Sequence, residues 1–225
     1  MKQKFLIFDS GPLISLSMTG MLYILEKLKT AHPEIIFILP AAVKRETIDK
    51  AARIKKYELE SVKLSNLLDK KVLQLSSEFI PNNKIQQQTA YFMQLADSLF
   101  SAGGEKIKPI QEGEASCLAF SKLCNAENLI VVDERTTRLL TESPASLHKI
   151  LERKLHTKLL FNNSKIKEFQ NFRFIRSSEL LFQVYQENLF DMKKNKQLLD
   201  ALLYAAKFSG AAISSKEIEE AKQLI

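Results

Sequence analysis

The stretch Lys4-Phe-Leu-Ile-Phe-Asp9-Ser-Gly-Pro-Leu-Ile14 decides how the rest of the chain is interpreted. Its apolar run over residues 5–8 predicts a buried strand, which the sequence Ser-Gly-Pro at 10–12 then ends. Pro12 suits the first turn of a following helix, where its missing N–H is not needed. In an open parallel sheet, ligands bind at the carboxyl ends of the strands. Asp9 is therefore either a site residue or the N-cap of that helix.

The composition limits the class of protein. The 225 residues are 45% hydrophobic, which allows a single domain over 1–225 with a substantial core. The net charge of +7 favours a polyanionic partner, nucleic acid above all. No run of about 18 apolar residues occurs, so we expect no membrane span. Cys117 and Cys124 lie two helical turns, roughly 10 Å, apart, so we expect reduced thiols in a cytoplasmic protein.

Strand and helix patterns alternate along the chain. Residues 35–39 and 129–132 are short apolar runs and predict two further parallel strands, and residues 172–175 predict an edge strand. Helical patterns lie between these runs. We therefore predict an α/β fold with a short parallel sheet flanked by helices.

Two segments are longer than such a sheet requires. Residues 50–105 have a mainly helical pattern and predict a helical insertion, which serves as a binding arm, a dimer surface or an extension of the core. Residues 141–171 form a basic helical or loop segment. Residues 148–176 contain eight Lys and Arg residues but only two Glu residues, and phenylalanines lie among them. These phenylalanines either contact nucleic acid or form core beneath a solvated basic face.

Four carboxylates lie near the ends of the predicted strands. Asp9 and Asp133 end strands, whereas Glu46 and Glu114 lie early in helices. Four carboxylates this close would repel one another unless a cation neutralised them, and hard oxygen ligands suit Mg²⁺ or Mn²⁺. Such a site can activate water to hydrolyse a phosphodiester. Adjacent acids leave two alternatives open: Glu112 in place of Glu114, and Glu134 in place of Asp133.

These pieces together resemble the PIN-domain family of metal-dependent nucleases. The matching stretches are residues 5–14, Arg45-Glu46, Gly113-Glu114-Ala-Ser and 129–138. The Gly113-Glu-Ala-Ser and Asp133-Glu-Arg pieces, with the C-terminal residues 213–220, are similar to a microbial, uncharacterised, VapC-like branch. The resemblance implies a Rossmann-like PIN fold and an endoribonuclease that depends on Mg²⁺ or Mn²⁺.

The resemblance also implies roles for individual residues. Asp9 and Asp133 would ligate the metal directly. Glu46 and Glu114 would bind it through water or orient the attacking water. Single-stranded or structured RNA would contact Ser10, Lys44, Arg45, Arg135 and Arg138, of which Arg135 or Arg138 would hold a phosphate.

Other functions fit the same residues. The first is a catalytically silent PIN-fold module that binds RNA or protein. The second is a toxin whose activity is held down by an antitoxin-like protein partner. The chain is longer than a minimal toxin needs, and its long helical segment also offers a surface for a homodimer.

Overall fold

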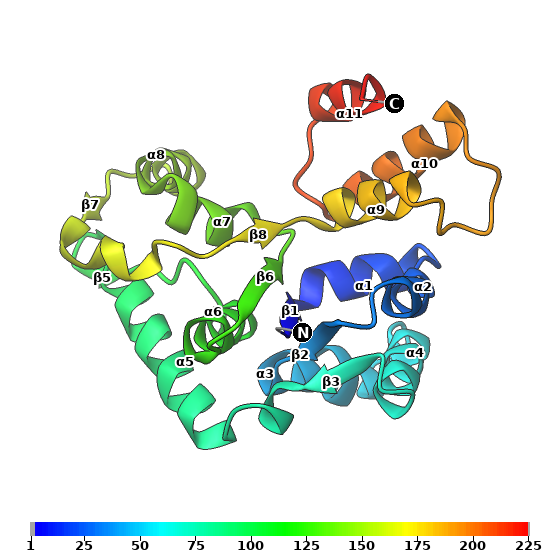
Figure 1. Ribbon diagram of the computed structural model, residues 1–225. Helices are drawn as coiled ribbons and strands as arrows, with labels where there is room; N and C mark the ends of the chain where they lie inside the picture. Colours follow the sequence, from blue (N-terminus) through cyan, green and yellow to red (C-terminus); the bar gives the residue numbers. More distant parts are fainter. Residues whose placement is uncertain (1–2, 225) are drawn as a thin grey trace.

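The computed structural model describes residues 3–224, and it places a parallel sheet between layers of helices (Figure 1). In this part of the chain, five strands form the main sheet in the order β3-β2-β1-β6-β8, and every neighbouring pair is parallel. The strands are β1 (Lys4–Phe8), β2 (Ile35–Leu39), β3 (Leu73–Leu75), β6 (Glu127–Val131) and β8 (Phe174–Ile175). The predicted α/β class with a short parallel sheet is confirmed. Residues 1, 2 and 225 of the predicted domain lie outside the described range.

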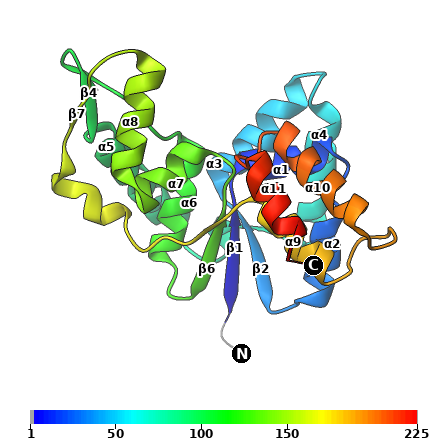
Figure 2. The ribbon, with the colours of Figure 1, turned by 90° about the horizontal axis from the view of Figure 1, so that it is seen from above.

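The sheet is buried on both faces, which explains its uninterrupted apolar strands. Helix α6 (Glu112–Leu123) packs on one face, beside α3 (Ala41–Lys44) and α5 (Asn82–Asp97). Helix α1 (Ser10–Met18) covers the other face, between α4 (Glu58–Asp69) and α9 (Ser177–Gln186). Figure 2 shows these two groups of helices on opposite sides of β1 and β6. Small residues in α6, such as Ala115 and Ala119, are buried and let it lie close to the sheet.

The segment 50–105 differs from the predicted helical insertion. It contains η2 (Ala51–Arg53), α4, β3, η3 (Ser76–Glu78), α5, β4 (Phe100–Ala102) and β5 (Glu105–Lys106). Strand β3 pairs with β2 through Phe37 and Leu73, so this segment supplies an edge strand of the main sheet. The correction has a simple cause. Only three residues pair in β3, and such a run cannot be distinguished from the end of a helical pattern.

The basic segment 141–171 does contain helix and loop, as expected. It includes the end of α7 (Arg135–Glu142), α8 (Pro144–Leu155), β7 (Leu160–Phe161) and η4 (Asn163–Phe169). Strand β7 joins β4 and β5 in a small antiparallel sheet. Phe169 is buried, and Phe161, Phe172 and Phe174 pack against the core. These phenylalanines are therefore core residues beneath the basic surface.

The remaining elements are helical. They are α2 (Ile24–Ala31), the π-helical segment η1 (Arg45–Lys50), α10 (Lys196–Phe208) and α11 (Ser215–Lys222). The Ser214 hydroxyl accepts a hydrogen bond from the backbone N–H of Glu217, and Glu217 Oε2 accepts one from the backbone N–H of Ser214, which together form a capping box. Cys117 is buried and Cys124 half-buried, and both are free thiols. Within residues 3–224, no helix is long and apolar enough to cross a membrane.

Candidate functional site

The four predicted carboxylates line one pocket of about 390 Å³ at the carboxyl ends of β1 and β6. Asp9 directly follows β1, Glu46 lies on η1, Glu114 lies in the first turn of α6, and Asp133 follows β6. The rest of this pocket, which we call the acidic pocket, is formed by Ser10, Gly11, Lys108, Pro109, Gln111, Gly113, Glu134, Thr136, Lys154 and Gly210. Parallel strands thus bring together acids from four separate parts of the sequence.

Asp9 is a buried acid without a full set of partners. Its backbone N–H donates to the carbonyl of Val131, which holds Asp9 at the carboxyl ends of the central strands β1 and β6. Its side chain is 5% exposed, and Oδ1 has no hydrogen-bond partner among the described residues. Burial, together with the nearby charge of Glu114, raises the pKa of Asp9 to about 7. Asp9 is the N-cap residue of α1, but its side chain makes no capping hydrogen bond within the described chain. The backbone N–H groups of Ser10 and Gly11 oppose part of the rise in its pKa.

Gly113 separates Asp9 from Glu46. A Cβ atom at this position would lie 3.2 Å from Asp9 Oδ1 and 3.3 Å from Glu46 Oε2. Both contacts are tighter than ordinary van der Waals distances, so a side chain here would press on the two carboxylates. The glycine therefore leaves open a space that these two oxygens face. Glu46 itself is exposed and can adjust toward an ion.

Glu114 is held by two hydrogen bonds. Its Oε2 accepts a bond of 2.7 Å from the backbone N–H of Gln111, and its Oε1 accepts one from the Thr137 hydroxyl. The side chain is 7% exposed, and burial is the main reason that its pKa is raised. Glu112, the open alternative, lies outside the acidic pocket and forms an ion pair of 2.5 Å with Arg45. Glu114 is thus the acid of this pair that faces the site.

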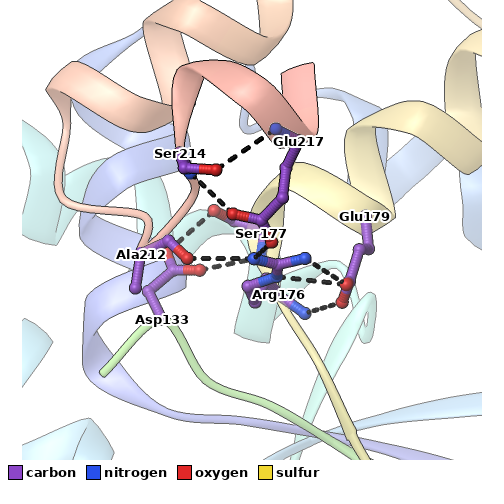
Figure 3. Close-up of polar contacts among 7 residues, drawn as sticks. All are labelled: Asp133, Arg176, Ser177, Glu179, Ala212, Ser214 and Glu217. Carbon is purple, nitrogen blue, oxygen red and sulfur yellow. Dashed lines mark hydrogen bonds and ion pairs between the residues drawn. The ribbon is translucent and has the colours of Figure 1, made fainter. Parts of the chain in front are cut away.

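Asp133 is held by one residue, Ser177 (Figure 3). The Ser177 backbone N–H donates to Oδ1 and its hydroxyl donates to Oδ2, both at 2.8 Å. Burial raises the pKa of Asp133, and the two bonds from Ser177 oppose that shift. The neighbouring Glu134 also lines the acidic pocket, where its Oε1 accepts a bond from the Thr136 hydroxyl. Both Asp133 and Glu134 therefore face the site, with Asp133 oriented more firmly.

Ser177 is in turn held in place by the residue before it. The Arg176 guanidinium contacts Glu179 on α9, Glu217 on α11 and the carbonyl of Ala212 (Figure 3). The distances from Arg176 to the two carboxylates are both 2.7 Å. This cluster ties the C-terminal helix to the start of α9. Local sequence pattern gives no connection between Ser177 and Asp133.

The predicted RNA-binding residues are spread around the site. Ser10 lines the acidic pocket, whereas Lys44 pairs with Asp49 at 2.6 Å. Arg135 is exposed on α7, and the half-buried Arg138 lies near enough to Asp133 for its charge to oppose the rise in the pKa of that acid. In the described chain, Lys44, Arg45, Arg135 and Arg138 do not line the acidic pocket.

Two lysines that were not predicted do line the acidic pocket: Lys108 and Lys154. Lys108 lies in the loop before α6, and Lys154 lies near the end of α8. The charge of the segment 141–171 was the available signal for Lys154, but the pattern could not show which of its lysines faces the acids.

The residues fit a hard divalent cation, though incompletely. The fit rests on the unpartnered Asp9 Oδ1, which shares the space over Gly113 with Glu46 Oε2. Carboxylate oxygens are the ligands that Mg²⁺ and Mn²⁺ prefer. Glu114 and Asp133 are engaged by hydrogen-bond donors. Accordingly, no group of three or more acidic, His or Cys side chains in residues 3–224 already has metal-binding spacing.

Comparison of the chain with protein-family models, with curated proteins and with solved structures found no match.

Proposed function

We propose that this chain is a PIN-like endoribonuclease that depends on Mg²⁺ or Mn²⁺. The single observation that carries the proposal is Asp9, whose buried and unpartnered carboxylate oxygen faces Glu46 across Gly113. A buried carboxylate without a partner is costly, and a bound cation would remove that cost. The order of acids along the chain and the parallel sheet support the PIN-like assignment.

Each group in the acidic pocket then has a role. A bound divalent cation would supply an activated water and neutralise charge on the phosphate. Asp9 and Glu46 would hold that cation. Glu114, fixed by Gln111 and Thr137, is suited to orient water. Lys108 and Lys154 would attract the RNA backbone.

The test is to titrate Mn²⁺ into the wild-type protein and the Asp9→Asn variant while following cleavage of a mixed single-stranded RNA. Loss of an outer-shell partner typically costs roughly 10- to 100-fold in metal affinity or activity, so loss of Asp9 should cost at least that much. Asp49→Asn is the matched control, because Asp49 pairs with Lys44 outside the acidic pocket. Cleavage by Asp9→Asn at the wild-type rate would refute the proposal.

A second candidate is the catalytically silent module. It is favoured by the engagement of Glu114 and Asp133 with donors, which leaves few free oxygens for an ion. This alternative predicts that wild-type protein binds RNA with the same affinity in EDTA and in Mn²⁺ and never cleaves it. The antitoxin-controlled toxin and the homodimer remain predictions from the sequence.

A further inference from the structure

An exposed pair of aromatic rings lies at the end of α10. Tyr204 and Phe208 are one helical turn apart, and their rings stack with centroids 5.9 Å apart and an angle of 28° between the ring planes. Phe208 is 82% exposed, and Tyr204 is half-buried beneath it. Single exposed apolar side chains are common on proteins, but here two rings form one surface. We call this pair the aromatic platform.

The end of the helix ties the aromatic platform to the acidic pocket. Gly210, two residues after Phe208, lines that pocket. The backbone N–H of Ala211 donates to the carbonyl of Ala206, and the N–H of Gly210 donates to the carbonyl of Lys207. With the φ of +114° at Gly210, these bonds form a Schellman motif, which fixes the turn. Two residues of backbone span at most about 7 Å, so the platform lies close to the rim of the acidic pocket.

A positive charge lies beside the aromatic platform. Lys207 Nζ is 5.6 Å from the centre of the Tyr204 ring, and it donates a hydrogen bond of 2.6 Å to the Ser215 hydroxyl. Neither contact neutralises the charge of the lysine. An anionic group that approaches the platform is therefore attracted to it.

These features together suit an unpaired nucleic-acid base and its phosphate. Unpaired bases stack on aromatic side chains, and this binding tolerates any sequence because every base has a π-face. A lysine beside the ring can contact a phosphate of the same strand. A purely apolar occupant, such as a helix from a second copy of the chain, would use neither the charge of Lys207 nor the neighbouring acidic pocket.

We propose that the aromatic platform stacks an unpaired base of the RNA strand whose phosphate is held in the acidic pocket. The choice of RNA as ligand rests on the proposed function. The stacked base would belong to a nucleotide close to that phosphate, because only two residues separate Phe208 from Gly210. The platform would favour single-stranded over double-stranded RNA, since the bases of a duplex already stack on one another.

The test measures binding of a fluorescent RNA pentamer, AAAAA, and of the same sugar–phosphate chain without bases, both in EDTA, where no metal-dependent cleavage occurs. Wild-type protein should bind AAAAA more tightly by roughly 5- to 150-fold, the range expected for one base stacked on an aromatic side chain. Phe208→Leu should lose most of this difference and keep its affinity for the base-free chain. Phe208→Tyr should retain the difference, because it keeps an aromatic ring.

Two further variants separate stacking from other effects. Tyr91→Leu removes an exposed aromatic ring of α5 that does not line the acidic pocket, and it should retain the wild-type difference. Lys207→Gln should weaken binding of AAAAA and of the base-free chain by a similar factor, because it acts on the phosphates that both contain. Thermal unfolding of every variant shows whether it is folded before its binding is interpreted.

The outcomes separate this proposal from the proposed function. A base-dependent affinity that Phe208→Leu loses, without any Mn²⁺-dependent cleavage by wild type, would support the aromatic platform and refute the nuclease. Cleavage by wild type together with equal binding of AAAAA and the base-free chain would refute the platform and keep the nuclease. A dimer in sedimentation experiments that Phe208→Leu dissociates would also overturn the proposal, because a second copy would then cover the platform.

Discussion

Asp9 carries a free-energy cost in the metal-free protein. Its pKa is raised from 3.8 to about 7, so the folded state holds a proton that the unfolded chain releases in this pH range. Because the folded state binds more protons, the contribution of Asp9 to stability falls as the pH rises from about 4 to 7. Above pH 7 the buried charge destabilises the fold until a cation neutralises it.

Replacing Asp9 with Asn should therefore stabilise the metal-free protein at pH 8. We expect a gain of about 2–4 kcal/mol in the free energy of unfolding at pH 8, and almost none at pH 4. Urea denaturation in EDTA at both pH values measures this difference. Addition of Mn²⁺ should then stabilise the wild-type protein and leave Asp9→Asn unchanged. A variant less stable than wild type at pH 8 would show that Asp9 is a structural residue.

The acids were predictable one by one, but their partners were not. Asp9 and Asp133 follow apolar runs, so their position at the sheet edge could be read from local pattern. Ser177 lies 44 residues beyond Asp133, and Thr137 lies 23 residues beyond Glu114. Such contacts depend on how elements pack, which a local pattern does not encode.

At the scale of elements, the contact between α9 and α11 helps to fix Ser177, the residue that orients Asp133. Arg176 joins the two helices through Glu179 and Glu217, and Ser177 follows Arg176 directly. Bonds from Ser214 and Arg176 lower the pKa of Glu217 to about 2, against the opposing effect of burial. The contribution of Glu217 to stability is thus present above pH 4.5 and is lost as the pH falls toward 2.

Removing the charge of Glu217 should loosen α11 at neutral pH. In Glu217→Gln we expect hydrogen exchange over residues 215–222 to become about 3- to 10-fold faster, because a charge-assisted hydrogen bond typically contributes 1.5–3 kcal/mol and exposure reduces that value here. Mass spectrometry of deuterated protein measures it. Glu219→Gln is the control, since among the described residues Glu219 pairs with Lys222 of α11 and not with Arg176. Equal exchange in both variants would contradict the proposed link.

The longest strands of the main sheet were the easiest to predict. Strands β1, β2 and β6 have five residues each, and their apolar runs stand out in the sequence. Strands β3 and β7 have three and two residues, and their pairing depends on neighbours far along the chain. The centre of the main sheet and its edge strand β8 could therefore be predicted from local pattern, whereas its other edge, β3, and the small antiparallel sheet could not.

At the scale of the whole molecule, a net positive charge accompanies an acidic pocket. The net charge is +7, yet the four acids meet in one pocket, with Lys108 and Lys154 at its wall. Such a distribution attracts a polyanion to the surface while the centre repels it until a cation is bound. RNA affinity should accordingly depend strongly on salt.

Lys154→Gln should reduce that salt dependence. We expect the slope of log affinity against log salt for single-stranded RNA to become less steep by about 0.7, the value for one lost phosphate contact. Fluorescence anisotropy between about 50 and 300 mM KCl, a roughly sixfold range of ionic strength, measures the slope. Lys193→Gln, on the exposed α9–α10 loop, is the control. An unchanged slope for Lys154→Gln would place the RNA backbone elsewhere.

The strand order has a consequence for synthesis on the ribosome. Strand β1 lies at the centre of the sheet, yet Phe8 pairs with Val131, which is translated more than a hundred residues later. At about 5–20 residues per second, the first strand waits roughly 6–25 s for this neighbour. Ser177, which orients Asp133, emerges later still. A nascent chain thus displays its first acids long before they can work together, and the proposed nuclease would stay inactive while its own messenger RNA is being read.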